Sequence, residues 1–317
     1  MNPYIYGTYI YGNSTPDVRL CLKKDDSNRL HYDVEFQSAL DTGHSENSIV
    51  KGEYYWPKAE KKTPLTILVH GMGDHSVIPC KLLTRALLEQ GVACFILYLT
   101  VHSRRMPKAM HDHLAYLSPE EWFQCYRISV IDIRQVVDWA YNRNELDATQ
   151  IVTLGISFGG FISAIAMGID ARIKAGVFIT TGGNSSKMNW LSKAGIYRRG
   201  YQQTEADYLN TQSRYADYLS EVSARGFENI VPARESFLTD PLTFASYLKG
   251  RPIMMINASW DKYIPKETVI EFWRACGQPI IKWLPSGHTS LWLWYPLIRR
   301  YIISFLKSFV HIASEPD

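Results

Sequence analysis

The chain has 317 residues, of which 46% are hydrophobic and 21% charged, and its formal net charge is +3 at pH 7. This length and apolar content suit a large α/β domain with a sizeable core, and the nearly balanced charge gives no reason to expect a nucleic-acid partner. Five widely spaced cysteines without a Cys-x-x-Cys pair argue against a disulfide framework or a zinc site and indicate reduced core residues. The expected partner is therefore a small molecule, and the oligomeric state stays open.

No segment predicts export or stable membrane insertion. The N-terminus lacks the basic start and apolar run of a signal peptide, and no window reaches the ~18 uncharged apolar residues that a membrane helix needs. Residues 291–312 come nearest, but Pro296, Arg299, Arg300 and Lys307 interrupt them, which indicates an amphipathic last helix docked on the sheet. We therefore expect a soluble cytoplasmic protein.

Apolar runs alternate with helical stretches along most of the chain. After an N-terminal extension of residues 1–29, residues 30–36 and 49–56 predict an antiparallel strand pair. Further strands are expected at residues 65–69, 93–99, 151–154, 173–180, 252–256 and 279–284, with helices between them, including a long one that begins with a capping box at Ser118. Strands that are apolar on both faces and separated by helices predict an α/β fold with a mostly parallel central sheet, covered by helices on both faces.

The alternation breaks down over residues 182–249, which are polar, rich in tyrosine and helical in pattern. An insertion at the carboxyl edge of such a sheet lies where ligands bind. We therefore expect an inserted helical cap at 182–249, between a first part of the core at 1–181 and a second part at 250–317. Trp190 and Tyr197 are expected to bind substrate, although such aromatic residues equally serve to pack an insertion onto the body.

A serine between two glycines follows the expected strand at residues 151–154, in the run Gly155-Ile156-Ser157-Phe158-Gly159, and a helix-like segment comes next. Glycines two residues before and after the serine permit a sharp strand-to-helix turn that exposes the serine hydroxyl. The pattern predicts that Ser157 is a nucleophile.

A serine nucleophile needs a base and a group that orients the base. Asp261 and His288 follow the last two expected strands, so both are expected at the same sheet edge as Ser157 and in the chain order that this type of nucleophile requires. The strongest competitor for the acid is Asp240, but it directly precedes Pro241 and is better explained as a helix cap.

Two backbone donors are expected to bind the oxyanion of the reaction. One is the Phe158 N–H, directly after the nucleophile, and the other is the Met72 N–H in the loop His70-Gly71-Met72-Gly73. His75 is expected to line the substrate pocket, with the alternative that its side chain only holds this loop by hydrogen bonds.

The triplet His111-Asp112-His113 has the spacing of a metal site, but no glutamate or cysteine cluster accompanies it. Solvated side chains explain it better. We expect neither a metal nor a cofactor.

Taken together, the segments around residues 70–73, 155–159, 261–265 and 287–288 resemble the α/β-hydrolase superfamily, within it the esterase and lipase-like branch with a serine nucleophile. The resemblance covers residues 52–310 apart from the insertion. It implies an α/β-hydrolase fold and a serine carboxylesterase that forms an acyl-enzyme on short- to medium-chain or aromatic esters, a small-molecule substrate. Two alternatives stay open: a peptidase or thioesterase that uses the same triad, and a non-catalytic protein of this fold that binds a ligand or a partner.

Overall fold

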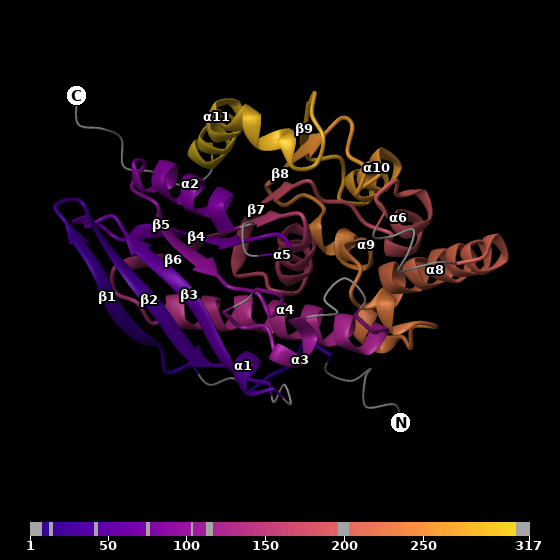
Figure 1. Cartoon of the computed structure of the whole chain (residues 1–317), viewed down its shortest axis with the longest axis horizontal. Coiled ribbons are helices and arrows are strands. Elements are labelled where there is room, and N and C mark those ends of the chain that lie inside the picture. Colours follow the sequence, from indigo (N-terminus) through magenta and orange to yellow (C-terminus); the bar gives the residue numbers. More distant parts are fainter. Residues whose placement is uncertain are drawn as a thin grey trace.

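The computed structural model describes residues 8–12, 15–40, 44–73, 77–102, 104–111, 117–195 and 203–308 (Figure 1). Within them, nine strands form one sheet in the order β1-β2-β3-β5-β4-β6-β7-β8-β9. The pairs β1–β2, β2–β3 and β3–β5 are antiparallel, and every pair from β5 to β9 is parallel. The strands are β1 (Arg19–Asp26), β2 (Arg29–Gln37), β3 (Ile49–Trp56), β4 (Thr63–Val69), β5 (Ala93–Leu97), β6 (Leu146–Ile156), β7 (Ile173–Ile179), β8 (Ile253–Ala258) and β9 (Ile280–Leu284).

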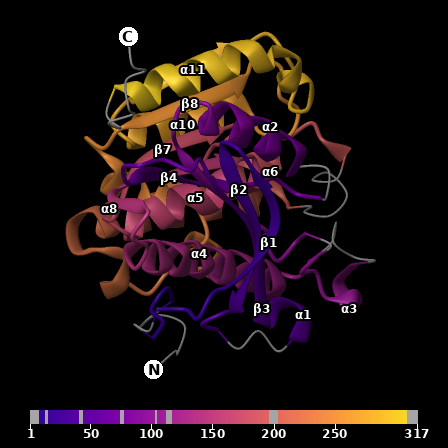
Figure 2. The ribbon, with the colours of Figure 1, turned by 90° about the vertical axis from the view of Figure 1, so that its left-hand side faces the viewer.

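Helices cover both faces of this sheet, as Figures 1 and 2 show. One apolar core packs the sheet against α2 (Val77–Leu88) and α11 (Tyr295–Lys307). The other packs it against α4 (Pro119–Tyr141), α5 (Phe158–Ile169), α9 (Pro241–Phe244) and α10 (Lys266–Ala275). The predicted α/β architecture with a mostly parallel sheet is confirmed. The remaining short helices of the core are α1 (Ser45–Ser48), α3 (Lys108–His111) and the 3-10 turn η6 (Ser290–Trp294).

Local signals in the sequence account for the best-predicted helix. Ser118 is the N-cap of α4, its hydroxyl accepts a hydrogen bond from the Glu121 N–H, and the Glu121 carboxylate accepts one from the Ser118 N–H. Pro119 occupies the first helical position, where its missing N–H costs nothing. The predicted capping box is therefore confirmed.

The sequence did not predict β1. Buried and exposed residues do not alternate along this strand, and most of its residues are exposed. The reason is that β1 lies at one edge of the sheet and pairs only with β2. The charged residues 23–26, which lack an apolar pattern, are part of this strand. Cys21 also lies on it and is only half-buried, whereas Cys80, Cys94, Cys125 and Cys276 are buried free thiols as expected.

The segment between β7 and β8 is helical, as predicted. It contains α6 (Ser185–Leu191), α8 (Glu205–Arg225), η3 (Phe227–Asn229), η4 (Glu235–Phe237), α9 and η5 (Ala245–Leu248). Tyr215 and Tyr218 lie on the buried side of α8. Its last part is integral to the core, because Phe244 and Leu248 are fully buried in the cluster that contains α5. None of the helices in the described part of the chain is long and apolar enough to cross a membrane.

Candidate active site

Four loops meet at the carboxyl edge of the parallel strands. They follow β4, β6, β8 and β9, and they carry the predicted oxyanion loop, Ser157, Asp261 and His288 in that order. Because β4, β6, β7, β8 and β9 are parallel neighbours, residues more than two hundred positions apart in the chain end at one edge.

Ser157 occupies a sharp turn between β6 and α5. Its backbone has φ 53° and ψ −118°, a conformation that costs a non-glycine residue about 1–3 kcal/mol. Its N–H donates to the Ile179 carbonyl at 2.8 Å, and its carbonyl accepts from the Gly160 N–H at 2.8 Å. These bonds hold the turn, and the hydroxyl is left at the tip.

The two glycines of the motif are required because neighbouring backbone atoms lie too close to them to leave room for a side chain. A Cβ on Gly155 would lie 2.3 Å from the Gly159 carbonyl oxygen, and a Cβ on Gly159 would lie 2.2 Å from the Val69 carbonyl oxygen. The second contact shows that the start of α5 lies directly against the end of β4. Glycine is the residue that permits both contacts.

The His288 ring lies between the other two predicted side chains. Its Nε2 is 3.0 Å from Ser157 Oγ, and its Nδ1 is 2.6 Å from Asp261 Oδ2. The second carboxylate oxygen of Asp261 accepts hydrogen bonds from the N–H groups of Tyr263 at 2.8 Å and Ile264 at 3.0 Å. With Nδ1 protonated toward Asp261, Nε2 carries the lone pair that can accept the serine proton.

Backbone hydrogen bonds join the loops that carry these two residues. The Ser259 N–H donates to the Leu284 carbonyl at 2.8 Å, and the Trp260 N–H donates to the Ser286 carbonyl at 2.9 Å. The β8–β9 pairing thus continues beyond the strands and fixes the Asp261 loop beside the His288 loop. Tyr263, which the sequence did not single out, places its ring 5.0 Å from the His288 ring and is 43% exposed.

The predicted oxyanion donors belong to the two backbone segments that meet at Gly159. Phe158 is the first residue of α5, and the first N–H groups of a helix have no partner within it. Met72 follows β4 and is 38% exposed. Its loop is anchored by the fully buried His70, whose Nδ1 lies 2.6 Å from the Gly71 carbonyl oxygen and whose Nε2 accepts the Leu99 N–H at 3.0 Å. The sequence alone predicts no role for His70.

Asp240 lies elsewhere and binds backbone groups. It is the N-cap of α9, where it accepts the Leu242 N–H at 2.9 Å, and it also accepts the Asn184 N–H at 2.9 Å and the Ser185 hydroxyl at 2.8 Å. Burial raises the pKa of this carboxyl group, although these hydrogen bonds act in the opposite direction. The residue ties the segment after β7 to α9.

The structure tests little of the predicted substrate contacts. His75 and Tyr197 lie outside the described residues. The Trp190 ring stacks on Tyr208 of α8, with centroids 5.0 Å apart, and is 40% exposed. The segment just after α6 is fixed to the acid-bearing loop, because the N–H groups of Lys193 and Ala194 both donate to the Lys262 carbonyl at 3.0 Å.

Metal ligands do not gather in the part of the chain that the structure describes: no group of three His, Cys, Asp or Glu side chains is close enough to hold an ion. Of the triplet at residues 111–113, Asp112, His113 and the His111 side chain lie outside the described residues. Burial raises the pKa of the Cys80, Cys94 and Cys276 thiols, so these cysteines are unreactive near neutral pH.

Comparisons with known proteins agree with this fold. The family model described as alpha/beta hydrolase domain containing 18 matches residues 12–308. The quorum-quenching protein AidA of Acinetobacter baumannii (strain MDR-ZJ06) is 22% identical over an alignment that covers 87% of this chain and 97% of that protein. An acetyl xylan esterase from Paenibacillus sp. R4 superimposes with a TM-score of 0.68 at 18% identity, over 94% of this chain and 90% of that one. Acetyl xylan esterase 1 from Thermoanaerobacterium sp. JW/SL YS485 gives 0.64 at 16% identity, over 93% and 90%.

Proposed function

The chain belongs to the alpha/beta hydrolase domain containing 18 family, and from this premise we propose that it is a serine hydrolase that cleaves carboxylic esters through an acyl-enzyme intermediate. The observation that supports the proposal most is the position of the His288 ring, 3.0 Å from Ser157 Oγ and 2.6 Å from Asp261 Oδ2. A hydroxyl, an imidazole and a buried carboxylate at these distances supply the nucleophile, the base and the group that orients the base, which such an ester hydrolase needs.

In the proposed reaction, Ser157 Oγ attacks the ester carbonyl carbon while His288 Nε2 takes the hydroxyl proton. Asp261 stabilises the imidazolium that results. The N–H groups of Met72 and Phe158 hold the negative charge on the former carbonyl oxygen. Collapse of this intermediate breaks the bond to the alcohol, which leaves with the proton from His288. Water then enters, gives a proton to His288, and releases the acid by the same steps in reverse order.

Exposed apolar side chains around the three residues favour an ester with an apolar or aromatic group. Met72 is 38% exposed, Tyr263 is 43% exposed, and Trp260, next to Asp261, is 67% exposed. Exposed aromatic residues beside a polar reacting centre suit recognition of an apolar group attached to a polar carbonyl. We infer short- to medium-chain or aromatic acyl esters as the substrate class, with the 182–249 insertion as a cap that contributes Trp190.

A series of p-nitrophenyl esters of increasing acyl length tests this proposal. We expect saturable hydrolysis with a maximum at short or medium chains, because the site presents apolar surface beside the serine. Labelling of the protein by a fluorophosphonate probe is expected in parallel, since the activated serine hydroxyl reacts with it irreversibly.

Two outcomes would contradict the ester assignment. Turnover of aminoacyl p-nitroanilides without turnover of esters would favour a peptidase that uses the same three residues. Absence of both turnover and labelling in a folded protein would favour a non-catalytic ligand-binding protein of this fold.

His70→Leu is expected to lower kcat for p-nitrophenyl acetate by up to about 10²-fold with little change in KM. Leucine removes the hydrogen bonds from the His70 ring to Gly71 and Leu99. The Met72 N–H is then no longer held in position to bind the negatively charged oxygen of the transition state. Steady-state kinetics beside a thermal melt measure the effect. An equal loss of kcat in a protein that has also lost its folded transition would instead assign His70 to stability alone.

A further inference from the structure

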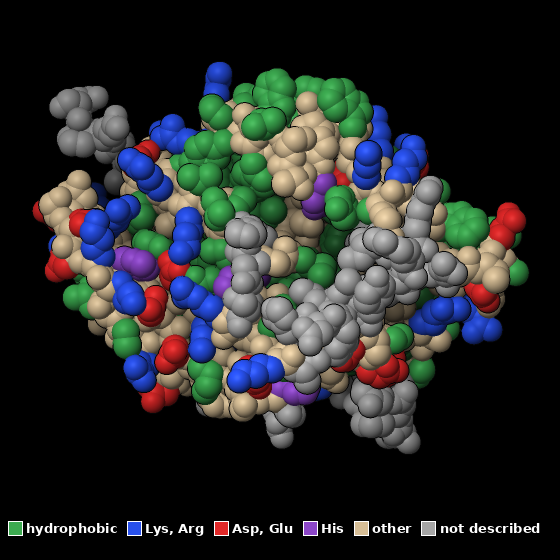
Figure 3. All heavy atoms as spheres, viewed as in Figure 1, with side chains coloured by type: hydrophobic (Ala, Val, Ile, Leu, Met, Phe, Trp, Pro, Cys, Tyr) green, Lys and Arg blue, Asp and Glu red, His purple; other side chains and the backbone are tan. Residues whose placement is uncertain are grey.

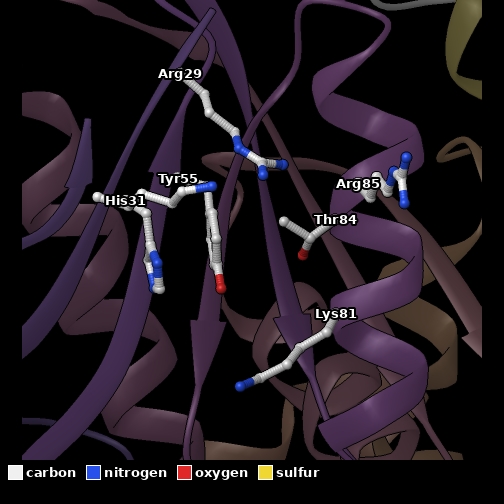
Figure 4. Close-up of a pocket in the computed structure, with 7 residues that line it drawn as sticks. Arg29, His31, Tyr55, Lys81, Thr84 and Arg85 are labelled. Carbon is white, nitrogen blue, oxygen red and sulfur yellow. The ribbon is translucent and has the colours of Figure 1, made fainter. Parts of the chain in front are cut away.

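A second polar site lies on another part of the molecule. A cavity of about 250 Å³ opens between the antiparallel strands and α2, and it shares no lining residue with the catalytic groups (Figure 4). Lys24 on β1, Arg29 on β2 and Tyr55 on β3 form one side. Lys81, Thr84 and Arg85 of α2 form the other. Figure 3 shows Lys and Arg side chains gathered over this end of the sheet, with acidic ones among them.

The acidic groups near the cavity do not cancel its positive charge. Asp26 accepts from both Arg29 at 3.1 Å and Lys24 at 3.0 Å, and Glu53 lies 3.0 Å from Lys81. With Glu89, which lies 3.8 Å from Arg85, three carboxylates therefore face the four cationic side chains that line the cavity.

The Glu53 carboxylate also accepts hydrogen bonds from uncharged hydroxyl groups. It is 2% exposed, it accepts hydrogen bonds from the hydroxyls of Tyr55 and Tyr98, and His31 Nε2 lies 3.2 Å from its Oε2. Burial alone would raise the pKa of this carboxyl, but its hydrogen bonds with His31, Tyr55, Tyr98 and Lys81 outweigh burial and hold the pKa far below its usual range. The Glu53 carboxylate is thus a fixed anion that pairs with Lys81, whereas Arg29 and Arg85 pair with other acids, Asp26 and Glu89.

The side chains at the rim keep donors available to a ligand. Arg29 uses its Nε on Asp26, which leaves the terminal nitrogens of its guanidinium group, and Figure 4 shows that end directed into the space beside the Tyr55 ring. Arg85 is 79% exposed in its side chain, and its nearest acid, Glu89 at 3.8 Å, also pairs with Arg299 at 2.8 Å.

We propose that this cavity binds the phosphate group of a small anionic molecule. Two guanidinium groups and two ammonium groups line it, and these are the donors that bind phosphate oxygens by charge-assisted hydrogen bonds. Its volume exceeds that of a single water and admits a phosphate with part of the group that bears it.

Calorimetric titration with inorganic pyrophosphate, against sodium chloride of equal ionic strength, tests the site. We expect saturable binding to one site, weakened about tenfold or more in Arg29→Gln.

The matched control is Lys23→Gln, which removes one charge from the same strand pair at a residue that pairs with Asp33 at 3.1 Å and does not line the cavity. It should bind pyrophosphate as the unaltered protein does, and so should Ser157→Ala, since the site is independent of hydrolysis. Heat that does not saturate, or equal weakening in Lys23→Gln and Arg29→Gln, would overturn the proposal.

Sedimentation with phosphatidylglycerol vesicles, with and without pyrophosphate, separates a lipid headgroup phosphate from a free one. If the unaltered protein sediments with the vesicles and Arg29→Gln does not, the ligand is a headgroup. If the unaltered protein does not sediment, the ligand is a soluble anion.

Discussion

Replacement of Ser157 by alanine is expected to lower kcat for p-nitrophenyl esters by about 10⁶-fold and to abolish fluorophosphonate labelling. The substitution removes the only atom that forms the covalent bond in the proposed reaction. It leaves the turn in place, because the backbone bonds from Ser157 N–H to Ile179 and from Gly160 N–H to Ser157 do not involve the hydroxyl. Labelling followed by gel fluorescence and stopped-flow ester hydrolysis measure the two effects.

Ser163→Ala is the matched control for this experiment. Ser163 lies on the same helix α5, is fully buried, and its hydroxyl has no hydrogen-bond partner within the described residues. Its replacement should leave labelling and turnover unchanged. If Ser157→Ala keeps full activity, or if both variants lose labelling equally, Ser157 is not the nucleophile.

Asp261→Asn is expected to lower kcat by about 10⁴-fold while the melting temperature changes little. Asparagine keeps the shape of the side chain and can still accept the N–H groups of Tyr263 and Ile264 through its carbonyl oxygen. Its amide nitrogen then faces His288 Nδ1, which forces the proton onto Nε2, the atom 3.0 Å from the serine hydroxyl. The imidazole in this tautomer cannot accept the serine proton.

The contrasting variant is Asp240→Asn, which tests the competing acid. Asp240 accepts backbone N–H groups from residues 184, 185 and 242, so the amide should lower the melting temperature and leave kcat of the folded enzyme nearly unchanged. Steady-state kinetics and thermal melts of both variants, measured side by side, provide the comparison. The reverse pattern, with activity lost in Asp240→Asn and kept in Asp261→Asn, would contradict the assignment of the acid.

Much of the fold follows from local patterns. Apolar strands alternating with helices predicted a parallel sheet, and the capping box at Ser118 fixed the start of α4 to the residue. The edge strand β1 escaped prediction for a physical reason: an edge strand with one partner and exposed faces has no apolar periodicity to reveal it. The sequence also predicted the whole of residues 182–249 as an insertion. In the structure its last part belongs to the core, because Phe244 and Leu248 are buried in the same apolar cluster as α5.

By itself, the sequence determined that Ser157, Asp261 and His288 each follow an apolar strand of a parallel sheet, because strand periodicity and alternation with helices are short-range patterns. It favoured Asp261 over Asp240 as the acid, but sequence spacing carries no distance between either carboxylate and the histidine. Only the tertiary structure decided that Asp261, and not Asp240, lies 2.6 Å from the His288 ring. The same holds for the cavity of the proposed anion site: Lys24 and Arg85 are 61 positions apart, and they line opposite sides of one cavity only once β1, β2, β3 and α2 have packed together.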